Sequence, residues 1–252
     1  AFGNCSGLTS IDIPDSVISI GEYAFYGCRE LTSINIPDSV TSIGGSAFRS
    51  CIGLTCITIP KGITSIGNAF SGCSGLKSVI MHDSVVSIGY EAFSGCEGLT
   101  SIDIPDSVVS IGDKAFSNCS GLTSITIPDG VTSIGKGVFN DCSELKSVIW
   151  NAEKCTKVDD SSIFNNCSNL SNVTIGNNVK TLPSCAFYGC AGLTSVYYFG
   201  TIDQWVVISF GGNYSNPITY AKKLYINNEL ITEVNLTTAT KISAYAFYGC
   251  RG

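Results

Sequence analysis

The sequence predicts an α/β repeat fold: a right-handed solenoid of about ten 23-residue coils, with a parallel strand ladder and short helical turns. Nine cysteines recur at a nearly constant interval, which is 23 throughout except for one interval of 22 and one of 25: Cys5, Cys28, Cys51, Cys73, Cys96, Cys119, Cys142, Cys167 and Cys190. A phenylalanine lies three positions before each of these cysteines, and a leucine lies three positions after it. A short fixed period is typical of stacked coils rather than of a globule with one central core.

One repeat, residues 8–28, shows how each element arises. The apolar–polar–apolar segment 11–13 has the period of a half-buried strand. Pro14 ends that strand because proline cannot donate a ladder hydrogen bond. A turn and a second short extended segment follow, and Gly21 permits a tight corner. Residues 24–28 are then expected to form a short helical turn that brings the phenylalanine and the cysteine to one side.

Stacking is required because one coil cannot bury its own apolar side chains. Each repeat supplies about eight inward residues, namely Leu, Ile, Ile, Val, Ile, Ala, Phe and Cys. With neighbouring strands about 4.8 Å apart, ten coils would extend over roughly 45–50 Å. We therefore expect a core that runs along the axis, with fraying at the terminal coils.

The recurring string LTSIxIPxSVTSIGxxAFxxC closely resembles the BspA-like leucine-rich repeats of bacterial and protist surface proteins. The resemblance extends over most of the chain and is specific because several columns recur together. It implies a leucine-rich-repeat solenoid and a location at the cell surface or in the secreted fraction. For some members it implies adhesion to host extracellular-matrix proteins or to other cells. It carries over no catalytic motif.

The repeat is interrupted near its C-terminal end, and the interruption predicts three segments. Residues 1–198 carry the leucine-rich repeats, residues 199–230 form an aromatic-rich insertion, and residues 231–252 resume a partial repeat. The basis is the spacing from Cys190 to Cys250, which exceeds two and a half periods of the repeat.

Two elements are expected within the insertion. A helix should begin near Gly200 or Thr201, with Trp205 on its apolar face, and residues 227–229 should form the turn of a hairpin. Further upstream, the longer interval between Cys142 and Cys167 contains the irregular segment 151–162, which predicts a bulged loop.

Composition excludes several classes of protein. Apolar residues make up 44% and charged residues only 13%, which is not the composition of a disordered chain. The net charge is −6 and the 14 basic residues are scattered, so no nucleic-acid partner is expected. No run approaches the length of a membrane span. The chain begins with Ala1 and stops within a repeat, and we expect it to be a piece of a longer protein whose signal and anchor lie elsewhere.

The outward strand column predicts a broad face of small polar residues, mostly serine and threonine. Three of its rungs carry larger apolar side chains, Ile80, Ile149 and Tyr197. Exposed apolar residues on a polar face indicate binding, so these three are candidate contacts for a partner. The alternative is a solvated sheet face without a ligand.

An aromatic cluster within the insertion is the sharper candidate. Eight of the chain's 25 aromatic residues fall between positions 197 and 225, and Tyr197, Trp205, Tyr214 and Tyr220 are the candidate partner-binding residues among them. Aromatic residues dominate interface hot spots and also stack on sugars and peptides. The alternative is that they fill a satellite core that anchors the insertion.

No metal, cofactor or catalytic site is predicted. Ten of the 13 cysteines occupy the inward column, where free buried thiols are expected, although the coil spacing does not exclude disulfides. The chain has no CxxC pair, and its one histidine, His82, replaces a turn proline. A column of turn aspartates would be helped by a bound cation, but a turn role alone accounts for it: Asp15, Asp38, Asp83, Asp106 and Asp129.

These patterns favour a non-enzymatic binding or adhesion module of a cell-surface or secreted protein. Its partner would be an extracellular-matrix or cell-surface macromolecule, either a protein or a glycan. The alternative is a structural spacer or stalk with no ligand of its own. Exposure of the aromatic cluster would favour binding, whereas its complete burial would favour the spacer.

Overall fold

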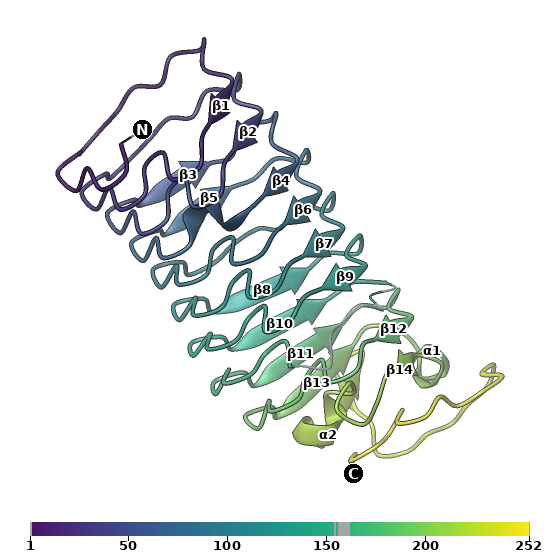
Figure 1. Cartoon of the computed structure of the whole chain (residues 1–252). Coiled ribbons are helices and arrows are strands. Elements are labelled where there is room, and N and C mark those ends of the chain that lie inside the picture. The colour runs from purple at the N-terminus through teal and green to yellow at the C-terminus, as the bar shows by residue number, and fades with distance from the viewer. Residues whose placement is uncertain (1, 154, 156–161, 252) are drawn as a thin grey trace.

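The computed structural model describes residues 2–153, 155 and 162–251. It is a parallel β-solenoid whose coils stack along one axis, with the two ends of the chain at opposite ends of the stack (Figure 1). From Phe2 to Phe187 the chain makes about eight regular turns, one for each pair of stacked phenylalanine rings. The coil number is slightly below the ten predicted because the chain departs from the regular repeat after Phe187.

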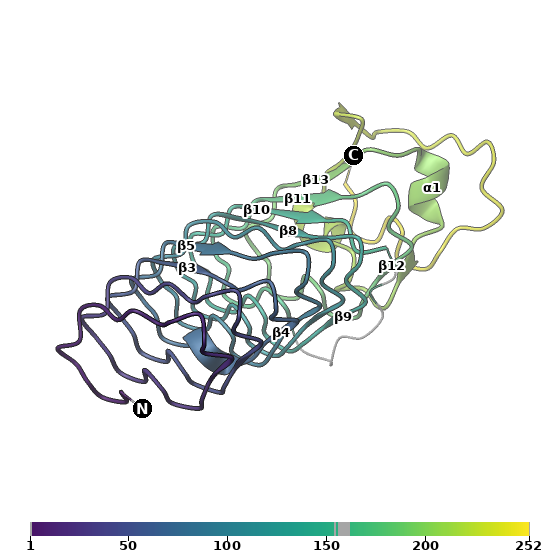
Figure 2. The same ribbon diagram turned by 90° about the horizontal axis from the view of Figure 1, so that it is seen from above.

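Two ladders of short strands run along the solenoid, one on each of two sides (Figures 1 and 2). The first ladder contains β3 (Cys56–Thr58), β5 (Ser78–Ile80), β8 (Ser124–Ile127), β10 (Ser147–Trp150), β11 (Asn172–Ile175), β13 (Ser195–Tyr198), β15 (Leu224–Ile226) and β16 (Glu229–Leu230). These strands form a two-stranded sheet, β3-β5, and a six-stranded sheet in the order β16-β15-β13-β11-β10-β8. All pairs are parallel except β15 with β16.

The second ladder consists of strands of two residues each. They are β1 (Ser19–Ile20), β2 (Ser42–Ile43), β4 (Ser65–Ile66), β6 (Ser87–Ile88), β7 (Ser110–Ile111), β9 (Ser133–Ile134), β12 (Thr181–Leu182) and β14 (Ser209–Phe210). They form three parallel sheets, β1-β2, β4-β6-β7-β9 and β12-β14. The serine faces outward and the isoleucine inward, as period-2 alternation requires.

The third side of each coil is a tight turn, and the solenoid contains little helix. In the regular repeats the residue two before the phenylalanine has a left-handed backbone, as at Tyr23 (φ 54°) and Glu91 (φ 50°), and a left-handed residue cannot continue a right-handed helix. The repeat that is one residue shorter, between Cys51 and Cys73, lacks this residue. Only there does the turn become a 3₁₀ helix, η1 (Asn68–Phe70), among the turns of the described residues.

The core is a column of stacked phenylalanine rings beside a column of buried thiols. Neighbouring rings lie 5.2–5.6 Å apart between centroids and within 11° of parallel. Each buried thiol donates to the carbonyl of the phenylalanine one coil earlier, as from Cys51 Sγ to Phe25 O at 3.0 Å. Burial raises the pKa of Cys51 to about 12. The prediction of free, buried ladder thiols is confirmed from Cys28 to Cys190, whereas Cys5 is exposed and Cys250 is half-buried.

The elements expected between residues 199 and 230 are present. Helix α1 (Ile202–Val206) begins after Thr201, whose side chain accepts from Gln204 N while the Gln204 side chain accepts from Thr201 N, a capping box. The hairpin joins β15 to β16 through Asn227 and Asn228, both with left-handed backbones.

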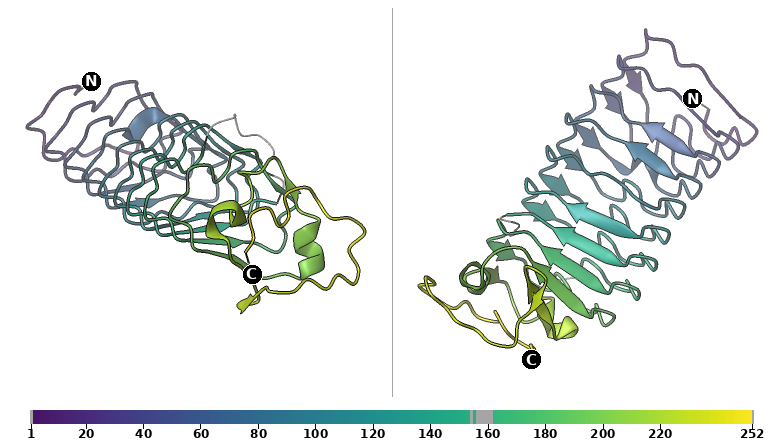
Figure 3. Two further views of the ribbon diagram at one scale, coloured as in Figure 1. Left: turned by 90° about the horizontal axis from the view of Figure 1, so that it is seen from below. Right: turned by 180° about the vertical axis from the view of Figure 1, so that it is seen from behind.

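This segment nevertheless continues the solenoid instead of standing apart as an insertion. Strand β14 extends the second ladder beside β12, and β15 extends the first ladder beside β13 (Figure 3). Phe187 N donates to Tyr214 O, the same bond that links the phenylalanine turns of the regular coils. Helix α2 (Ile218–Ala221) follows, and Ile218 takes the inward place of the repeat cysteine. The coil from Cys190 to Ile218 is longer than a regular one, and α1 accommodates the excess.

The C-terminal segment closes the end of the stack without adding a strand. Residues 231–236, where the repeat pattern resumes in the sequence, are irregular. The segment is held by three residues of α1: Trp205 Nε1 donates to Ala246 O at 2.9 Å, Val206 O accepts from Ser243 N at 2.7 Å, and Asp203 accepts three backbone N–H groups from residues 237–239 at 2.7–2.9 Å. The bulged loop predicted for 151–162 falls largely outside the described residues.

The Asp203 anchor should respond to acid. Hydrogen bonds from backbone N–H groups, led by that of Thr238, lower the pKa of Asp203 to about 2. Because the pKa of Asp203 is lower in the folded chain than its value near 3.9 in the unfolded chain, the ionised carboxylate stabilises the fold at pH values above about 3.9. This stabilisation is lost as the pH falls through about 2. We expect the amide NMR shifts of 237–239 to titrate with a midpoint near pH 2, in step with the Asp203 carboxyl. At pH 7, Asp203→Asn should shift the same amides, while Asp103→Asn on the strand face should not.

Candidate functional site

The outward column of the first ladder lies in register, as its spacing predicted. Pairing places Ile149 between Thr126 and Thr174, and Tyr197 between Thr174 and Tyr225. The side chains of this column project from the sheet, because the strands alternate exposed and buried residues. The neighbouring outward column, two positions earlier on each strand, is mostly serine, as at Ser124 and Ser147. Threonine hydroxyls just before the strands bond to the preceding coil, as from Thr123 Oγ1 to Thr100 O at 3.2 Å.

Near the C-terminal end this column becomes apolar and aromatic. We define the strand-face strip as Ile149, Thr174, Tyr197, Tyr225 and Leu230, which are consecutive partners across β10, β11, β13, β15 and β16. The rings of Tyr197 and Tyr225 stack at 5.0 Å between centroids with an interplanar angle of 19°. Ile149 and Leu230 are 41% and 43% exposed, which marks the strip as a solvent-facing apolar surface.

Ile80 lies apart from the strip. It is 56% exposed on β5, but β5 pairs only with β3 among the described strands, and the ladder resumes at β8. Residues 101–104 of the intervening coil form no strand. The structure thus brings Ile149 and Tyr197 together and leaves Ile80 alone on the same side of the solenoid.

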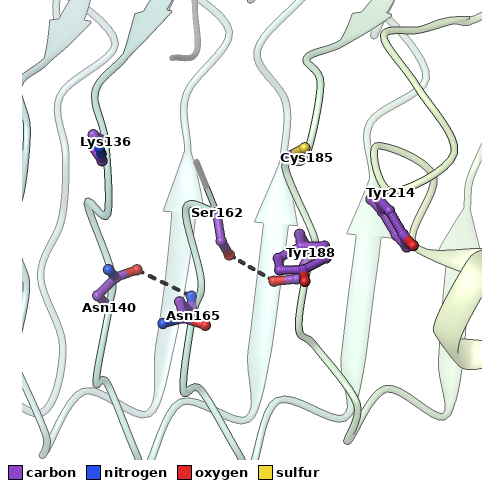
Figure 4. Close-up of a pocket in the computed structure, with 7 residues that line it drawn as sticks. All are labelled: Lys136, Asn140, Ser162, Asn165, Cys185, Tyr188 and Tyr214. Carbon is purple, nitrogen blue, oxygen red and sulfur yellow. Dashed lines mark hydrogen bonds between the residues drawn. The ribbon is translucent and has the colours of Figure 1, made fainter. Parts of the chain in front are cut away.

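A second surface lies on the turn side of the solenoid. The turn-face groove crosses four successive coils and is shallow, with a volume of about 380 Å³. Figure 4 shows its lining side chains arranged coil by coil. These residues are Lys136, Asn140, Ser162, Asn165, Cys185, Tyr188 and Tyr214.

Aromatic rings form one end of this groove. Tyr188 and Tyr214 meet edge to face at 5.0 Å between centroids, and both are exposed. Tyr220 lies behind Tyr214 at 6.3 Å, and its hydroxyl accepts from Gly189 N at 3.0 Å. Burial is the largest cause that raises the pKa of Tyr220, so this phenol is neutral where it accepts from Gly189 N.

Amide and hydroxyl groups form the rest of the groove. Asn140 Oδ1 accepts from Asn165 N at 3.2 Å, and Ser162 Oγ donates to Tyr188 O at 2.7 Å. Within the described ranges no hydrogen bond involves Asn140 Nδ2 or the Asn165 side chain, although both residues are half-buried. The groove therefore holds polar groups with hydrogen-bonding capacity to spare beside an aromatic wall.

Trp205 is not available to a partner in the folded chain. Its side chain is fully buried, contacts Tyr198 and Phe210, and donates to Ala246 O. The structure therefore does not support Trp205 as a partner contact. It favours the alternative, in which Trp205 is a core residue that anchors the end of the solenoid. The aromatic cluster thus divides among the strip, the groove and the core, apart from Phe199, which is exposed outside all three.

Several residues of these surfaces were absent from the sequence prediction. Tyr225 and Leu230 join the strip because β15 and β16 continue the ladder, and Tyr188 joins the groove because Tyr214 stacks one coil later. Treating Cys190 to Ile218 as one lengthened repeat would have placed Tyr225 one coil after Tyr197, because the two pairs have the same spacing in the sequence.

The described residues contain no group of three or more His, Cys, Asp or Glu side chains placed to hold a metal ion. One of the turn aspartates has a local partner: Asp38 accepts from Lys61 N at 3.3 Å and pairs with its ammonium at 3.6 Å. Within the described ranges, no helix is long and apolar enough to cross a bilayer.

The solenoid is similar to solved leucine-rich repeat structures. A leucine-rich repeat protein from Bacteroides ovatus ATCC 8483 is 33% identical with a TM-score of 0.66, over 83% of this chain and 58% of that one. A leucine-rich cell surface protein from Faecalibacterium prausnitzii A2-165 is 26% identical with a TM-score of 0.45, over 82% of this chain and 64% of that one. The leucine-rich repeat protein of T. pallidum is 28% identical with a TM-score of 0.49, over 73% and 78%.

The chain therefore spans less than two thirds of the first two of these proteins. A search of curated proteins gave no match. The model of the BspA type leucine-rich repeat region matches residues 1–100 and 86–216, with six copies. Together with the observed coils, ladders and phenylalanine column, this match shows that the chain belongs to the family of BspA-type leucine-rich repeat proteins.

Proposed function

We propose that the chain is a non-enzymatic binding module of a larger cell-surface or secreted protein, and that it holds a partner protein on the strand-face strip. The family supports the surface location, and the strip supports binding. The observation that carries the proposal is the row from Ile149 to Leu230, in which the exposed Ile149 and Leu230 flank the half-buried, stacked rings of Tyr197 and Tyr225.

The composition of the strip is that of a protein interface. Tyrosine is enriched at hot spots because its ring buries a large apolar area with few rotatable bonds and keeps a polar tip. Tyr197 and Tyr225 stack on each other, so they are already ordered before a partner arrives. Preordering reduces the entropy lost on association.

The charges near the strip favour an acidic partner surface. Exposed Lys146 and Lys223 lie at the starts of β10 and β15, next to Ser147 and Leu224. Because rim charges steer association more than they set affinity, their removal should slow the on-rate and reduce its dependence on salt. The partner would be an extracellular-matrix or cell-surface protein with apolar side chains bordered by carboxylates.

The spacer alternative has its own support in the core. The phenylalanine column runs unbroken from Phe2 to Phe187, which gives a stiff rod, and Trp205 is buried. A stiff rod needs no ligand, but a spacer gives no reason for an apolar strip in contact with water. The two functions separate on a binding measurement.

The test is a binding screen with a matched pair of variants. The purified chain is immobilised, and extracellular-matrix proteins, mucins and soluble cell-surface ectodomains are passed over it. We expect saturable binding of at least one protein, weakened roughly 30-fold by Tyr197→Ala combined with Tyr225→Ala, as for a hot-spot pair.

Ile80→Ala is the control, because Ile80 is an exposed apolar residue of the same column on a separate sheet. This substitution should leave the affinity for the partner unchanged. A loss of affinity would show that the binding site also includes Ile80, as the sequence predicted. Equal binding by the double tyrosine variant and the unmodified chain would contradict the proposal, as would a panel without any binder, which favours the spacer.

A further inference from the structure

We propose that the turn-face groove is a separate carbohydrate-binding site, which takes a pyranose ring of a glycan. One sugar ring lies against Tyr214 and Tyr188, and the hydroxyls of this sugar and of the next ones along the glycan bond to the side chains of Asn165 and Asn140, one and two coils from Tyr188. The site lies on the turn side of the solenoid, away from the strand-face strip, and does not depend on it.

The aromatic end of the groove fits the apolar face of a sugar. A pyranose carries axial C–H groups on its faces, and these are attracted to the negative face of an aromatic ring. The edge-to-face geometry of Tyr188 and Tyr214, at 81°, offers two walls at nearly a right angle. Tyr220 supports Tyr214 from behind, so this corner is built before a ligand binds.

The amide groups supply the complementary polar contacts. A carboxamide has both a donor and an acceptor, and it can bond two neighbouring hydroxyls of a sugar at once. Asn140 and Asn165 sit on adjacent coils, and the Asn165 N to Asn140 Oδ1 bond holds the two together. Both amides are half-buried and solvent-accessible, so their unpaired groups are open to ligand hydroxyls.

Other ligand classes fit the groove less well. An extended peptide would need free backbone groups, but the groove backbone is already bonded between coils, as from Asp141 N to Asn165 O and from Phe187 N to Tyr214 O. A nucleic acid would need several cations, and Lys136 is the only charged residue of the lining. A purely apolar ligand would leave the amide groups unsatisfied.

Lys136 would distinguish acidic sugars from neutral sugars as ligands of the groove. It lies on the coil of Asn140 and makes no ion pair within the described ranges. A uronic or other carboxylated sugar would gain from this ammonium, whereas a neutral hexose would not. Acidic and neutral sugars are therefore tested side by side, with Lys136→Ala as the variant that should affect only the acidic ligand.

A thiol in the groove provides the measurement. Cys185 is half-buried within the lining, and Cys56 is exposed on the strand face as an internal reference in the same molecule. The chain is alkylated with iodoacetamide in the presence of increasing glucuronic acid or glucose oligosaccharides, and both sites are quantified by peptide mass spectrometry. We expect the sugar to slow alkylation of Cys185 and to leave Cys56 unaffected.

Variants then tie the protection to the named side chains. Tyr214→Ala should raise the sugar concentration required for half protection roughly tenfold, whereas Tyr214→Phe, which keeps the ring, should stay close to the unmodified chain. Tyr90→Ala, at an exposed tyrosine on a distant turn, should have no effect. The side-chain amide NMR signals of Asn140 and Asn165 should shift on titration.

The outcomes are decisive in either direction. Selective protection of Cys185 that Tyr214→Ala weakens supports the site. Protection that persists unchanged in Tyr214→Ala overturns it, as does equal slowing at Cys185 and Cys56, or no protection by any sugar at millimolar concentration. The Tyr197 and Tyr225 double variant should leave sugar protection intact, so failure of this site and failure of the strand-face strip are distinguishable.

Discussion

Replacement of Phe93 by alanine should destabilise the solenoid by about 3–5 kcal/mol, the usual effect of removing a fully buried aromatic ring. The Phe93 ring is stacked between Phe70 and Phe116, at 5.6 Å between centroids on either side, and it is fully buried. Its loss therefore removes two ring contacts and leaves a cavity in mid-column. Chemical and thermal unfolding followed by circular dichroism would measure the change.

Two comparisons make this expectation specific to the column. Thr100→Ala changes an exposed residue of the first ladder and should alter the unfolding free energy by less than about 0.5 kcal/mol. Phe25→Ala removes a ring near the open end, where coils fray, and should lower the main transition less than Phe93→Ala does. Similar losses from Phe93→Ala and Thr100→Ala would contradict the assignment of inner and outer faces.

The regular part of the fold was predictable because every coil must bury the same set of apolar side chains against its neighbours. A residue type that recurs at one position, such as the phenylalanine column, must meet its own copy one coil away, so register follows from the period alone. The same argument placed Ile149 and Tyr197 on one outward column. It also identified the buried thiols, since a small apolar residue that recurs once in every coil packs against its neighbour.

The C-terminal coil was harder to predict because the residues at the repeat positions differ from those of the regular coils, whereas the backbone hydrogen bonds between coils are the same. Ser215 stands where the phenylalanine belongs and Ile218 where the cysteine belongs, so no motif marks the coil. The backbone bond from Phe187 N to Tyr214 O keeps the stack regardless of side chain. The sequence pattern therefore predicted an insertion, although residues 199–230 complete both ladders.

The candidate surfaces were predictable only in part for the same reason. Tyr214 and Tyr220 stood out as aromatic residues beside a Gly/Asn/Pro loop, but their neighbours in the groove come from three earlier coils. Asn140 and Asn165 look like ordinary turn residues in the sequence. What joins them is the lateral stacking of turns, which is a property of the assembled solenoid.

Replacement of Trp205 by alanine should release the C-terminal end of the chain while the regular coils remain folded. The indole is fully buried, meets the Tyr198 ring edge to face at 5.4 Å, and donates to Ala246 O at 2.9 Å. Removing it should cost about 3–5 kcal/mol in this last coil and in the C-terminal segment that packs on it. Hydrogen exchange measured by mass spectrometry should show lost protection from residue 205 onward.

The conservative variant separates the hydrogen bond from the packing. Trp205→Phe keeps most of the buried area, and Ala246 O still accepts from Asn216 Nδ2 at 3.0 Å, so no buried carbonyl is left without a donor. Its cost should therefore be about 1 kcal/mol, the net value of one hydrogen bond. Unchanged protection of residues 237–250 in Trp205→Ala would show that the remaining bonds, to Asp203, Val206 and Asn216, suffice to hold the segment. A loss of protection at Phe93 would show that the end and the middle of the solenoid unfold as one unit.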